Sequence, residues 1–145
     1  MNISFFRLTS CTEKQITDIV SLYTSAGWWK EEYDATSLPH LIESSFCFFI
    51  AQDADGQTIG MGRALSDGVS IAYIQDLAVL TRARGMGIGS ALLSHMTAYL
   101  KSVGISSIIL MAQPGTATFY TSCGWHIMPQ RICLLQEGLY DNQFT

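Results

Sequence analysis

The segment LAVLTRARGMGIGSALL, Leu77 to Leu93, joins an apolar run to a predicted amphipathic helix. It holds three glycines in alternate positions: Gly85, Gly87 and Gly89. Apolar residues recur with a helical period over residues 88–103, which places the glycines at a strand-to-helix junction. The first N–H groups of a helix have no partner within it, and residues without a Cβ let an anion approach them closely. The turn therefore predicts a pyrophosphate site, with Arg82 and Arg84 as further donors.

Two other phosphate-binding motifs fit this turn poorly. A P-loop needs a lysine followed by serine or threonine after its last glycine, and no lysine follows Gly89. The dinucleotide fingerprint GxGxxG needs a third glycine where Ser90 stands. A turn that only eases helix packing remains the alternative, but it leaves the two arginines without a role.

Composition narrows the class of protein. The chain has 145 residues, of which 48% are hydrophobic, so we expect a single domain over residues 1–145. A formal net charge of -4 argues against general binding to nucleic acid or a membrane surface, since both need a basic face. The four cysteines contain no CxxC pair and the three histidines have no ligand spacing. We therefore expect no metal site and a reduced, cytoplasmic protein.

The hydrophobic pattern predicts an α/β (α+β) chain. We expect strands over residues 2–10, 46–52, 57–66, 70–80, 105–113 and 131–136, and helices after Thr12, after Ser37, over residues 88–103 and over residues 115–123. Thr12 and Gln15 form a predicted capping box, and Gly27 can end the first helix. Turn residues at 53–56 and 67–68 predict that the strands between residues 46 and 80 form an antiparallel meander.

The glycine turn also resembles a known signature. VLTRARGMGIGSALL is similar to the acyl-CoA signature of the GNAT N-acetyltransferases, whose Q/R-x-x-G-x-G/A pattern is matched by Arg84, Gly87 and Gly89. The preceding strand IQDLAVL and the later AQPGTATFYTSCGW resemble further segments of that family, so the likeness covers roughly residues 46 to 125. It implies the GNAT fold: a central, mixed, mostly antiparallel sheet of about six to seven strands flanked by about four helices. GMGRALSDG with IQDLAVL is also similar, more weakly, to the branch with plant-type serotonin and arylalkylamine acetyltransferases.

The resemblance implies acetyl-CoA as co-substrate, without a metal. The cofactor-binding positions carried over are Leu77, Ala78, Val79, Arg84, Gly85, Met86, Gly87, Ile88, Gly89, Ser90, Gln113, Thr116 and Phe119. Among these, the main chain of residues 77–79 is expected to pair with the pantetheine arm, and residues 84–90 to hold the pyrophosphate. Gln113 stands where many members have asparagine and keeps the amide chemistry with a longer reach, and Thr116 stands where alanine is usual.

Two residues are candidates for proton transfer. An alkylamine is mostly protonated at pH 7 and must lose a proton before it attacks an acetyl group. Asp76, just before the acetyl-binding segment, is the carboxylate that could take this proton, directly or through water, or could have a structural or orienting role. Tyr120 matches the family tyrosine that protonates the departing thiolate. Strand alternation places Asp76 on the face opposite Leu77.

The acceptor site is predicted from WWKEEYD, residues 28–34. The expected acceptor-binding residues are Trp28, Trp29, Asp34 and Gln75. Acidic groups would attract a cationic amine and a tryptophan could stack on it, while packed tryptophans and solvated acids are the alternative. We expect an N-acetyltransferase acting by direct attack in a ternary complex on a primary amine of a small molecule, such as an arylalkylamine or polyamine. A non-catalytic acyl-CoA-binding or regulatory domain, a protein or peptide amine as acceptor, and a homodimer are left open.

Overall fold

The computed structural model describes residues 2–138 and is of the mixed α/β class, as predicted. The chain divides into two compact units, Met1–Met111 and a second that starts at Ala112, and each is described by itself. The first unit holds a five-stranded sheet in the order β1-β2-β3-β4-β5. The strands are β1 (Ser4–Arg7), β2 (Cys47–Gln52), β3 (Thr58–Ser66), β4 (Ile71–Val79) and β5 (Ser107–Leu110). The helices of this unit are α1 (Glu13–Ser25), α2 (Leu38–Ser44) and α3 (Ile88–Ser102).

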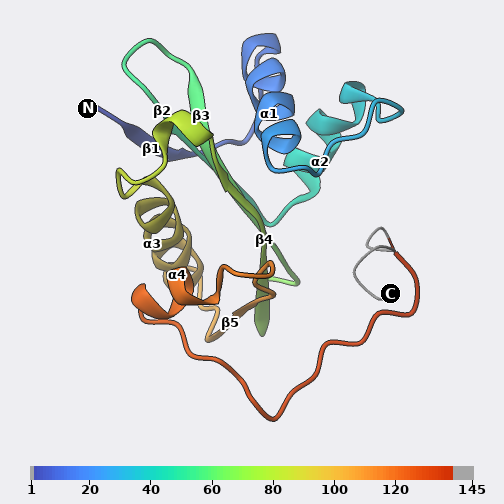
Figure 1. Ribbon diagram of the computed structural model, residues 1–145, viewed down its shortest axis with the longest axis vertical. Helices are drawn as coiled ribbons and strands as arrows, with labels where there is room; N and C mark the ends of the chain where they lie inside the picture. Colours follow the sequence, from blue (N-terminus) through green and yellow to red (C-terminus); the bar gives the residue numbers. More distant parts are fainter. Residues whose placement is uncertain (1, 139–145) are drawn as a thin grey trace. The chain divides into compact units, whose positions relative to one another are not determined.

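The sheet lies between two layers of helix (Figure 1). α1 and α2 cover one face, and α3 covers the other. β1 to β4 pair antiparallel with their neighbours, and β5 returns parallel to β4 after α3. The predicted meander of β2, β3 and β4 is confirmed. No helix in the described residues is long and apolar enough to cross a membrane.

Local signals set the ends of α1 as predicted. Thr12 accepts a hydrogen bond from the backbone N–H of Gln15, and the Gln15 side chain accepts one from the Thr12 backbone. This capping box satisfies donors that the first helical turn leaves unpaired. Gly27 follows the helix with a φ of 80°, a conformation that favours glycine.

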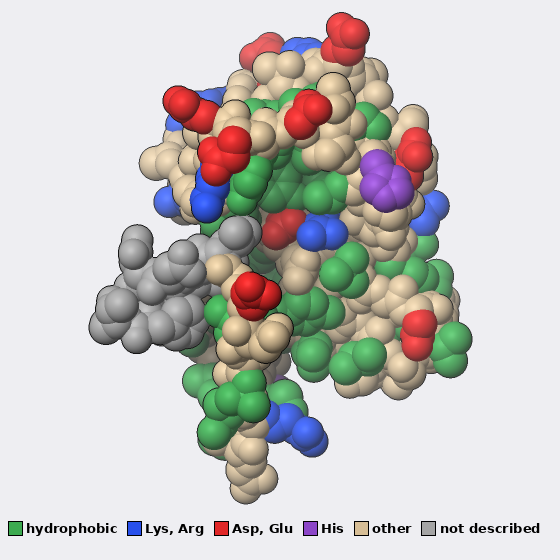
Figure 2. Space-filling view, turned by 90° about the vertical axis from the view of Figure 1, so that its right-hand side faces the viewer, with side chains coloured by type: hydrophobic (Ala, Val, Ile, Leu, Met, Phe, Trp, Pro, Cys, Tyr) green, Lys and Arg blue, Asp and Glu red, His purple; other side chains and the backbone are tan. Residues whose placement is uncertain are grey.

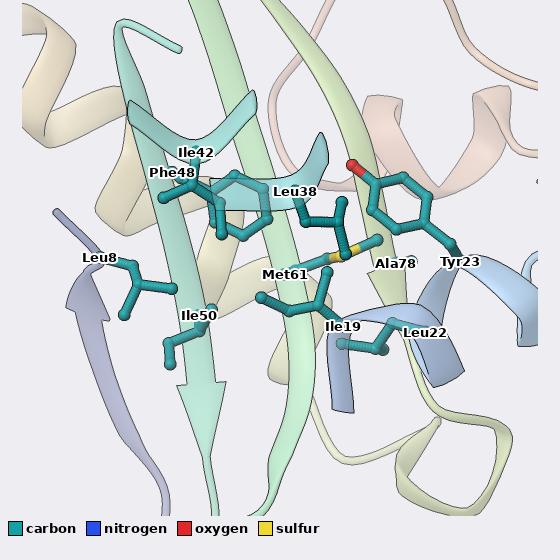
Figure 3. Packing of buried hydrophobic residues seen from close by; sticks show 10 residues of the cluster. All are labelled: Leu8, Ile19, Leu22, Tyr23, Leu38, Ile42, Phe48, Ile50, Met61 and Ala78. Carbon is teal, nitrogen blue, oxygen red and sulfur yellow. The ribbon is translucent and has the colours of Figure 1, made fainter. Parts of the chain in front are cut away.

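Residues of α1 and α2 pack against β2, β3 and β4 (Figure 3). The cluster consists of Leu8, Ile19, Leu22, Tyr23, Leu38, Ile42, Phe48, Ile50, Met61 and Ala78. Figure 3 shows the hydroxyl of Tyr23 directed away from the aliphatic side chains of Ile19 and Leu22. The Tyr23 ring is thus part of the core, while its polar end leaves it.

The opposite face of β3 carries glycines because α3 packs close to it. A Cβ at Gly60 would lie 2.9 Å from the Leu92 Cδ1 atom, and one at Gly62 would lie 2.7 Å from the Met96 sulfur. Both distances are shorter than ordinary van der Waals contact. These two glycines therefore set how closely α3 approaches the sheet.

Two expectations on strands need correction. The described residues contain five strands, fewer than the six to seven expected. Residues 131–136 form no strand, although their apolar pattern predicted one. Ile132 and Leu134 are 83% and 87% exposed, so these side chains lack the buried face that favours a strand. In the second unit the predicted helix over residues 115–123 is present as α4 (Ala117–Ser122), and four α-helices in the described residues match the expected number.

Candidate functional site

The glycine turn is an exposed backbone loop between β4 and α3. A short 3₁₀ helix, Thr81–Ala83, follows β4, and the chain then passes through Arg84 and the glycines into α3. Gly85 and Gly87 have φ values of 78° and 77°, in the left-handed region. A Cβ at either position would meet no atom within 4 Å, so the space beside both is open.

The N-terminus of α3 has no side-chain cap. Gly87 occupies the N-cap position, and the first turn contains no acidic residue. Ile88 is buried and anchors this turn, while Ser90 is exposed. A helix N-terminus that carries partial positive charge without a nearby carboxylate suits an anion.

The two arginines near the turn have different surroundings. Arg84 is exposed, and its Nε donates to the Val79 carbonyl at 3.2 Å. Arg82 donates instead to the Gln57 side chain and lies 3.5 Å from the Asp53 carboxylate, in the turn between β2 and β3. A hydrogen bond from the Gln57 backbone N–H lowers the pKa of Asp53, with a smaller contribution from Arg82. Arg82 thus braces the hairpin to the loop, a contact that the sequence did not indicate.

β4 contains a bulge directly before the predicted acetyl-binding segment. Arg63 of β3 pairs with Gln75 and Met61 pairs with Ala78, so one residue of β3 faces two of β4. Asp76 is one of those two and has a φ of 57°. A bulge places an extra residue in one strand and re-aims its side chain.

The bulge gathers a polar network on the face covered by α1. The Arg63 Nε donates to Asp76 Oδ2 at 2.6 Å, and its Nη2 donates to Gln75 Oε1 at 2.9 Å. The Tyr23 hydroxyl donates to the same Asp76 Oδ2 at 2.8 Å. The Ser45 hydroxyl accepts from Arg63 Nη1 at 3.4 Å. Two consecutive residues of β4 therefore contact one arginine.

This network is half-buried, and the opposite charges of Arg63 and Asp76 neutralise each other. The side chains of Arg63 and Asp76 are 16% and 24% exposed. Burial, and then the Asp76 carboxylate, raise the pKa of Tyr23 above its ordinary value, so the hydroxyl stays protonated and donates. Charge-assisted hydrogen bonds of this kind are stronger than neutral ones.

Tyr23, Arg63 and Ser45 were not predicted as site residues. Tyr23 falls within the helix predicted after Thr12, and Arg63 within the strand predicted over residues 57–66. The available signal was Arg63 itself, a charged residue within the apolar strand GMGRALS, because a charge inside a strand needs a partner. The face of Asp76 agrees with expectation: its carboxylate meets Tyr23 of α1, whereas Leu77 Cδ1 would lie 3.1 Å from a Cβ at Gly62, on the α3 side.

The two ends of β4 have different neighbouring strands. The pairing of β4 with β5 covers Ile71 to Ile74, whereas Gln75, Ala78 and Val79 pair with β3 alone among the described strands. Leu77 and Val79 are half-buried, and Ala78 is buried. The predicted cofactor segment therefore has one edge that β5 does not cover.

The predicted acceptor residues split into two groups. The Tyr23 ring is near both tryptophans, with its centroid 6.4 Å from Trp28 and 6.1 Å from Trp29, and the Trp29 ring meets Tyr33 edge-on at 5.6 Å. Through Tyr23, this aromatic cluster contacts Asp76, which shares Arg63 with Gln75. Asp34 has a local role: it caps the 3₁₀ helix Ala35–Ser37 by accepting from the Thr36 backbone N–H at 2.9 Å. That hydrogen bond lowers the pKa of Asp34.

Acidic side chains gather on the upper part of the face shown in Figure 2. Lower on that face, one carboxylate and one basic side chain lie next to each other beside hydrophobic side chains. Glu31 and Glu32 are exposed, as expected for charges in the loop between α1 and α2. The face thus combines negative charge with apolar surface.

The remaining predicted residues belong to the second unit. Tyr120 lies in α4, with its ring edge-on to Phe119 at 5.0 Å and to Trp125 at 6.3 Å. Burial raises the pKa of Tyr120, with a further contribution from Cys123. Thr116 is the N-cap residue of α4, and its hydroxyl donates to the Gln113 carbonyl at 2.7 Å. This unit therefore holds a protonated tyrosine among aromatic rings.

The sequence matches the model of the "Acetyltransferase (GNAT) family" over residues 13–125. It is 39% identical over 72 residues to an uncharacterized N-acetyltransferase ycf52-like of Prochlorococcus marinus, covering 50% of this chain and 40% of that protein. It is 33% identical over 82 residues to the chloroplastic serotonin N-acetyltransferase 2 of rice, Oryza sativa subsp. japonica, covering 57% of this chain and 41% of that protein. The chain thus spans about two fifths of the length of these two relatives.

The fold matches a solved structure over nearly the whole chain. A GNAT family acetyltransferase of Streptococcus pneumoniae superimposes with a TM-score of 0.69 and 25% identity, covering 94% of this chain and 100% of that one. The mixed sheet between two helical layers is therefore an arrangement that this chain shares with a GNAT acetyltransferase.

Proposed function

This chain belongs to the GNAT acetyltransferase family, and we propose from that premise that it transfers an acetyl group from acetyl-CoA to a primary amine of a small molecule. The amine attacks directly in a ternary complex: a nitrogen–carbon bond forms, the carbon–sulfur bond breaks, the nitrogen loses a proton and the thiolate gains one. The observation that carries the proposal is the open glycine turn at the uncapped N-terminus of α3.

The glycine turn fits a pyrophosphate. Gly85 and Gly87 keep open the space in which a side chain would otherwise stand, and backbone N–H groups at the start of α3 can point into it. Arg84 is exposed beside them and can supply a charge-assisted hydrogen bond. The chain as a whole carries net negative charge, so such a local arrangement is needed to bind a polyanion.

The edge of β4 supports a second contact with the cofactor. Residues 77–79 lack β5 as a neighbour, so their main-chain groups on that side, apart from the Val79 carbonyl that accepts from Arg84, can pair with the amide-bearing pantetheine arm. Acetyl-CoA, when bound, would supply the thioester whose acetyl group is transferred. The chain's contribution here is to orient that group, which accounts for much of the rate in reactions of two bound substrates.

Tyr120 is the proposed acid. Its raised pKa keeps the hydroxyl protonated at neutral pH, the form that a thiolate leaving group needs. Phe119, Gln113 and Thr116 are proposed to line the cofactor on the same unit. Asp76 is the remaining candidate for a role at the amine, as base or as an orienting group.

The acceptor is proposed to be a small arylalkylamine. Trp28 and Trp29 present rings next to Tyr23, and Gln75 lies beside Asp76, so aromatic and polar contacts adjoin. The rice relative is named for serotonin, an arylalkylamine, which favours this class of acceptor over a polyamine. Asp34 would act here only through its negative charge, because its carboxylate is engaged in a cap.

A single domain over residues 1–145 and a cytoplasmic location are part of the proposal. The rice relative is described as chloroplastic, so the site of action is to be determined by imaging a tagged chain in its source cell.

The test is a CoA-release assay with acetyl-CoA and a panel of arylalkylamines, polyamines, amino sugars and peptides with free amino groups. We expect saturable CoA release with arylalkylamines and a product heavier than the amine by one acetyl group. Release with peptides alone would move the acceptor to protein amines. Binding of acetyl-CoA without turnover on any amine would indicate a non-catalytic acyl-CoA-binding domain.

A further inference from the structure

The backbone of Asp76 has a conformation that residues with a Cβ atom disfavour. It is the only residue other than glycine with a positive φ among the described residues. Left-handed backbone costs a non-glycine residue free energy, although aspartate tolerates it better than most. Such a conformation persists only where the surrounding structure fixes it.

Two side chains from different elements fix it here. Tyr23 reaches Asp76 from α1, 53 residues earlier, and Arg63 reaches it from β3, 13 residues earlier. Both donate to the same carboxylate oxygen, Oδ2, at 2.8 and 2.6 Å. Tyr23 is itself held by the core cluster, so its hydroxyl has a fixed position.

The position of this contact matters for the proposed reaction. Asp76 directly precedes residues 77–79, and the pairing of β4 with β5 has ended by this point. The bulge therefore decides which way the proposed cofactor segment faces. The hydrogen bonds of Asp76 to Tyr23 of α1 and Arg63 of β3 connect that segment to the packed core.

We propose that Tyr23 and Arg63 are positioning residues that hold the bulge at Asp76 in place; Tyr23, Arg63 and Asp76 together are called the latch. In this proposal the Asp76 carboxylate is the anion of the latch and does not take the acceptor's proton. The latch rests on the proposed function in so far as residues 77–79 hold acetyl-CoA. The negative charge of the Asp76 carboxylate is paired with the Arg63 guanidinium, and a proton taken from the acceptor would remove that charge and weaken the pair. The titratable or charged groups that contact Asp76 in the described chain are Arg63 and Tyr23.

Substitution of Asp76 separates the two roles. Glycine adopts a φ of 57° without strain, whereas alanine does not, and neither has a carboxylate. The latch predicts that kcat/KM of Asp76→Gly exceeds that of Asp76→Ala by about 5- to 30-fold, the factor for a strain of about 1–2 kcal/mol. It also predicts that Asp76→Asn, whose side-chain oxygen can still accept from Tyr23 and Arg63, retains more of kcat/KM than Asp76→Ala. Equal losses in the glycine and alanine variants, or a loss in Asp76→Asn as large as in Asp76→Ala, would overturn the latch in favour of a base.

Hydrogen exchange tests the latch without any turnover. Tyr23→Phe removes the hydroxyl and keeps the ring, and Tyr99→Phe is the matched control because its hydroxyl accepts from Arg7, away from Asp76. We expect backbone exchange in residues 77–79 to rise about tenfold or more in Tyr23→Phe and to stay unchanged in Tyr99→Phe. Unchanged exchange in folded Tyr23→Phe would overturn the latch. Increased exchange in a protein that acetylates no amine would leave the latch standing and reject the proposed function.

Discussion

The glycine turn and the Asp76 latch lie at opposite ends of the same short stretch of chain and are built in opposite ways. The turn is exposed, and its open space and uncapped helix end leave backbone groups available. The latch is half-buried, and its side chains already hydrogen-bond one another. The first region is suited to bind a ligand, and the second to hold backbone in place. Substitutions in the two regions should therefore change different measured quantities.

The largest effect should come from neither region. If the glycine turn binds acetyl-CoA and the latch positions residues 77–79, another group must protonate the leaving thiolate. Tyr120 is the candidate for that group. We expect Tyr120→Phe to lower kcat about 100-fold with little change in acetyl-CoA affinity, because general acids contribute at least that much. Steady-state kinetics together with calorimetric titration of acetyl-CoA would measure both.

The pH dependence of this step has a defined sign. A general acid acts in its protonated form, and burial raises the pKa of Tyr120. Turnover should therefore persist to a higher pH than an ordinary tyrosine, with a pKa of about 10, would allow, and should fall as pH rises through the raised value. Full turnover in Tyr120→Phe under conditions where chemistry limits the rate would show that another group is the acid.

Gly87→Val tests whether the turn acts through binding. A branched side chain would fill the space proposed for the pyrophosphate, and we expect the KM for acetyl-CoA to rise about 10- to 100-fold, the loss of a charge-assisted hydrogen bond. Gly104→Val is the matched control, because Gly104 also has a positive φ and open space but follows the other end of α3. An equal rise in both variants would mean that strain, rather than ligand approach, is responsible.

Arg63 in the latch and Arg82 near the glycine turn are expected to contribute differently to the free energy of unfolding. Arg63→Met leaves a half-buried carboxylate without its cation, and we expect the free energy of unfolding to fall by about 2 kcal/mol. Arg82→Met removes a more exposed ion pair, so its loss should be smaller. Urea unfolding of both variants measures the difference. Equal losses would mean that burial of the Arg63 pair has no energetic consequence.

The smallest effect is expected at the aromatic cluster. Trp29→Ala should raise the KM for an arylalkylamine about 2- to 30-fold, corresponding to a cation–π or stacking contact of about 0.5–2 kcal/mol. The KM for acetyl-CoA should change less. Trp29→Phe keeps a ring and should recover most of the loss. Unchanged acceptor kinetics in folded Trp29→Ala would assign this residue to core packing alone.

Much of the fold could be predicted because its signals are local. The capping box at Thr12 and Gln15, the left-handed Gly27 and the period of α3 each depend on residues within a few positions of one another. The strand expected over residues 131–136 failed for a related reason. An apolar pattern indicates a strand only if another element covers it, and in the structure these side chains are largely exposed.

The sequence by itself determined the fold class, the meander and the glycine turn at the start of α3, because backbone freedom and hydrophobic period are properties of neighbouring residues. Tertiary structure alone decided that Asp76 meets Tyr23 and Arg63, and that Arg82 braces a hairpin. A bulge shifts the register of β4 by one residue and brings Gln75 and Asp76 to the same arginine. That shift depends on how β3, β4 and α1 pack together, so no periodicity within a single strand could reveal it.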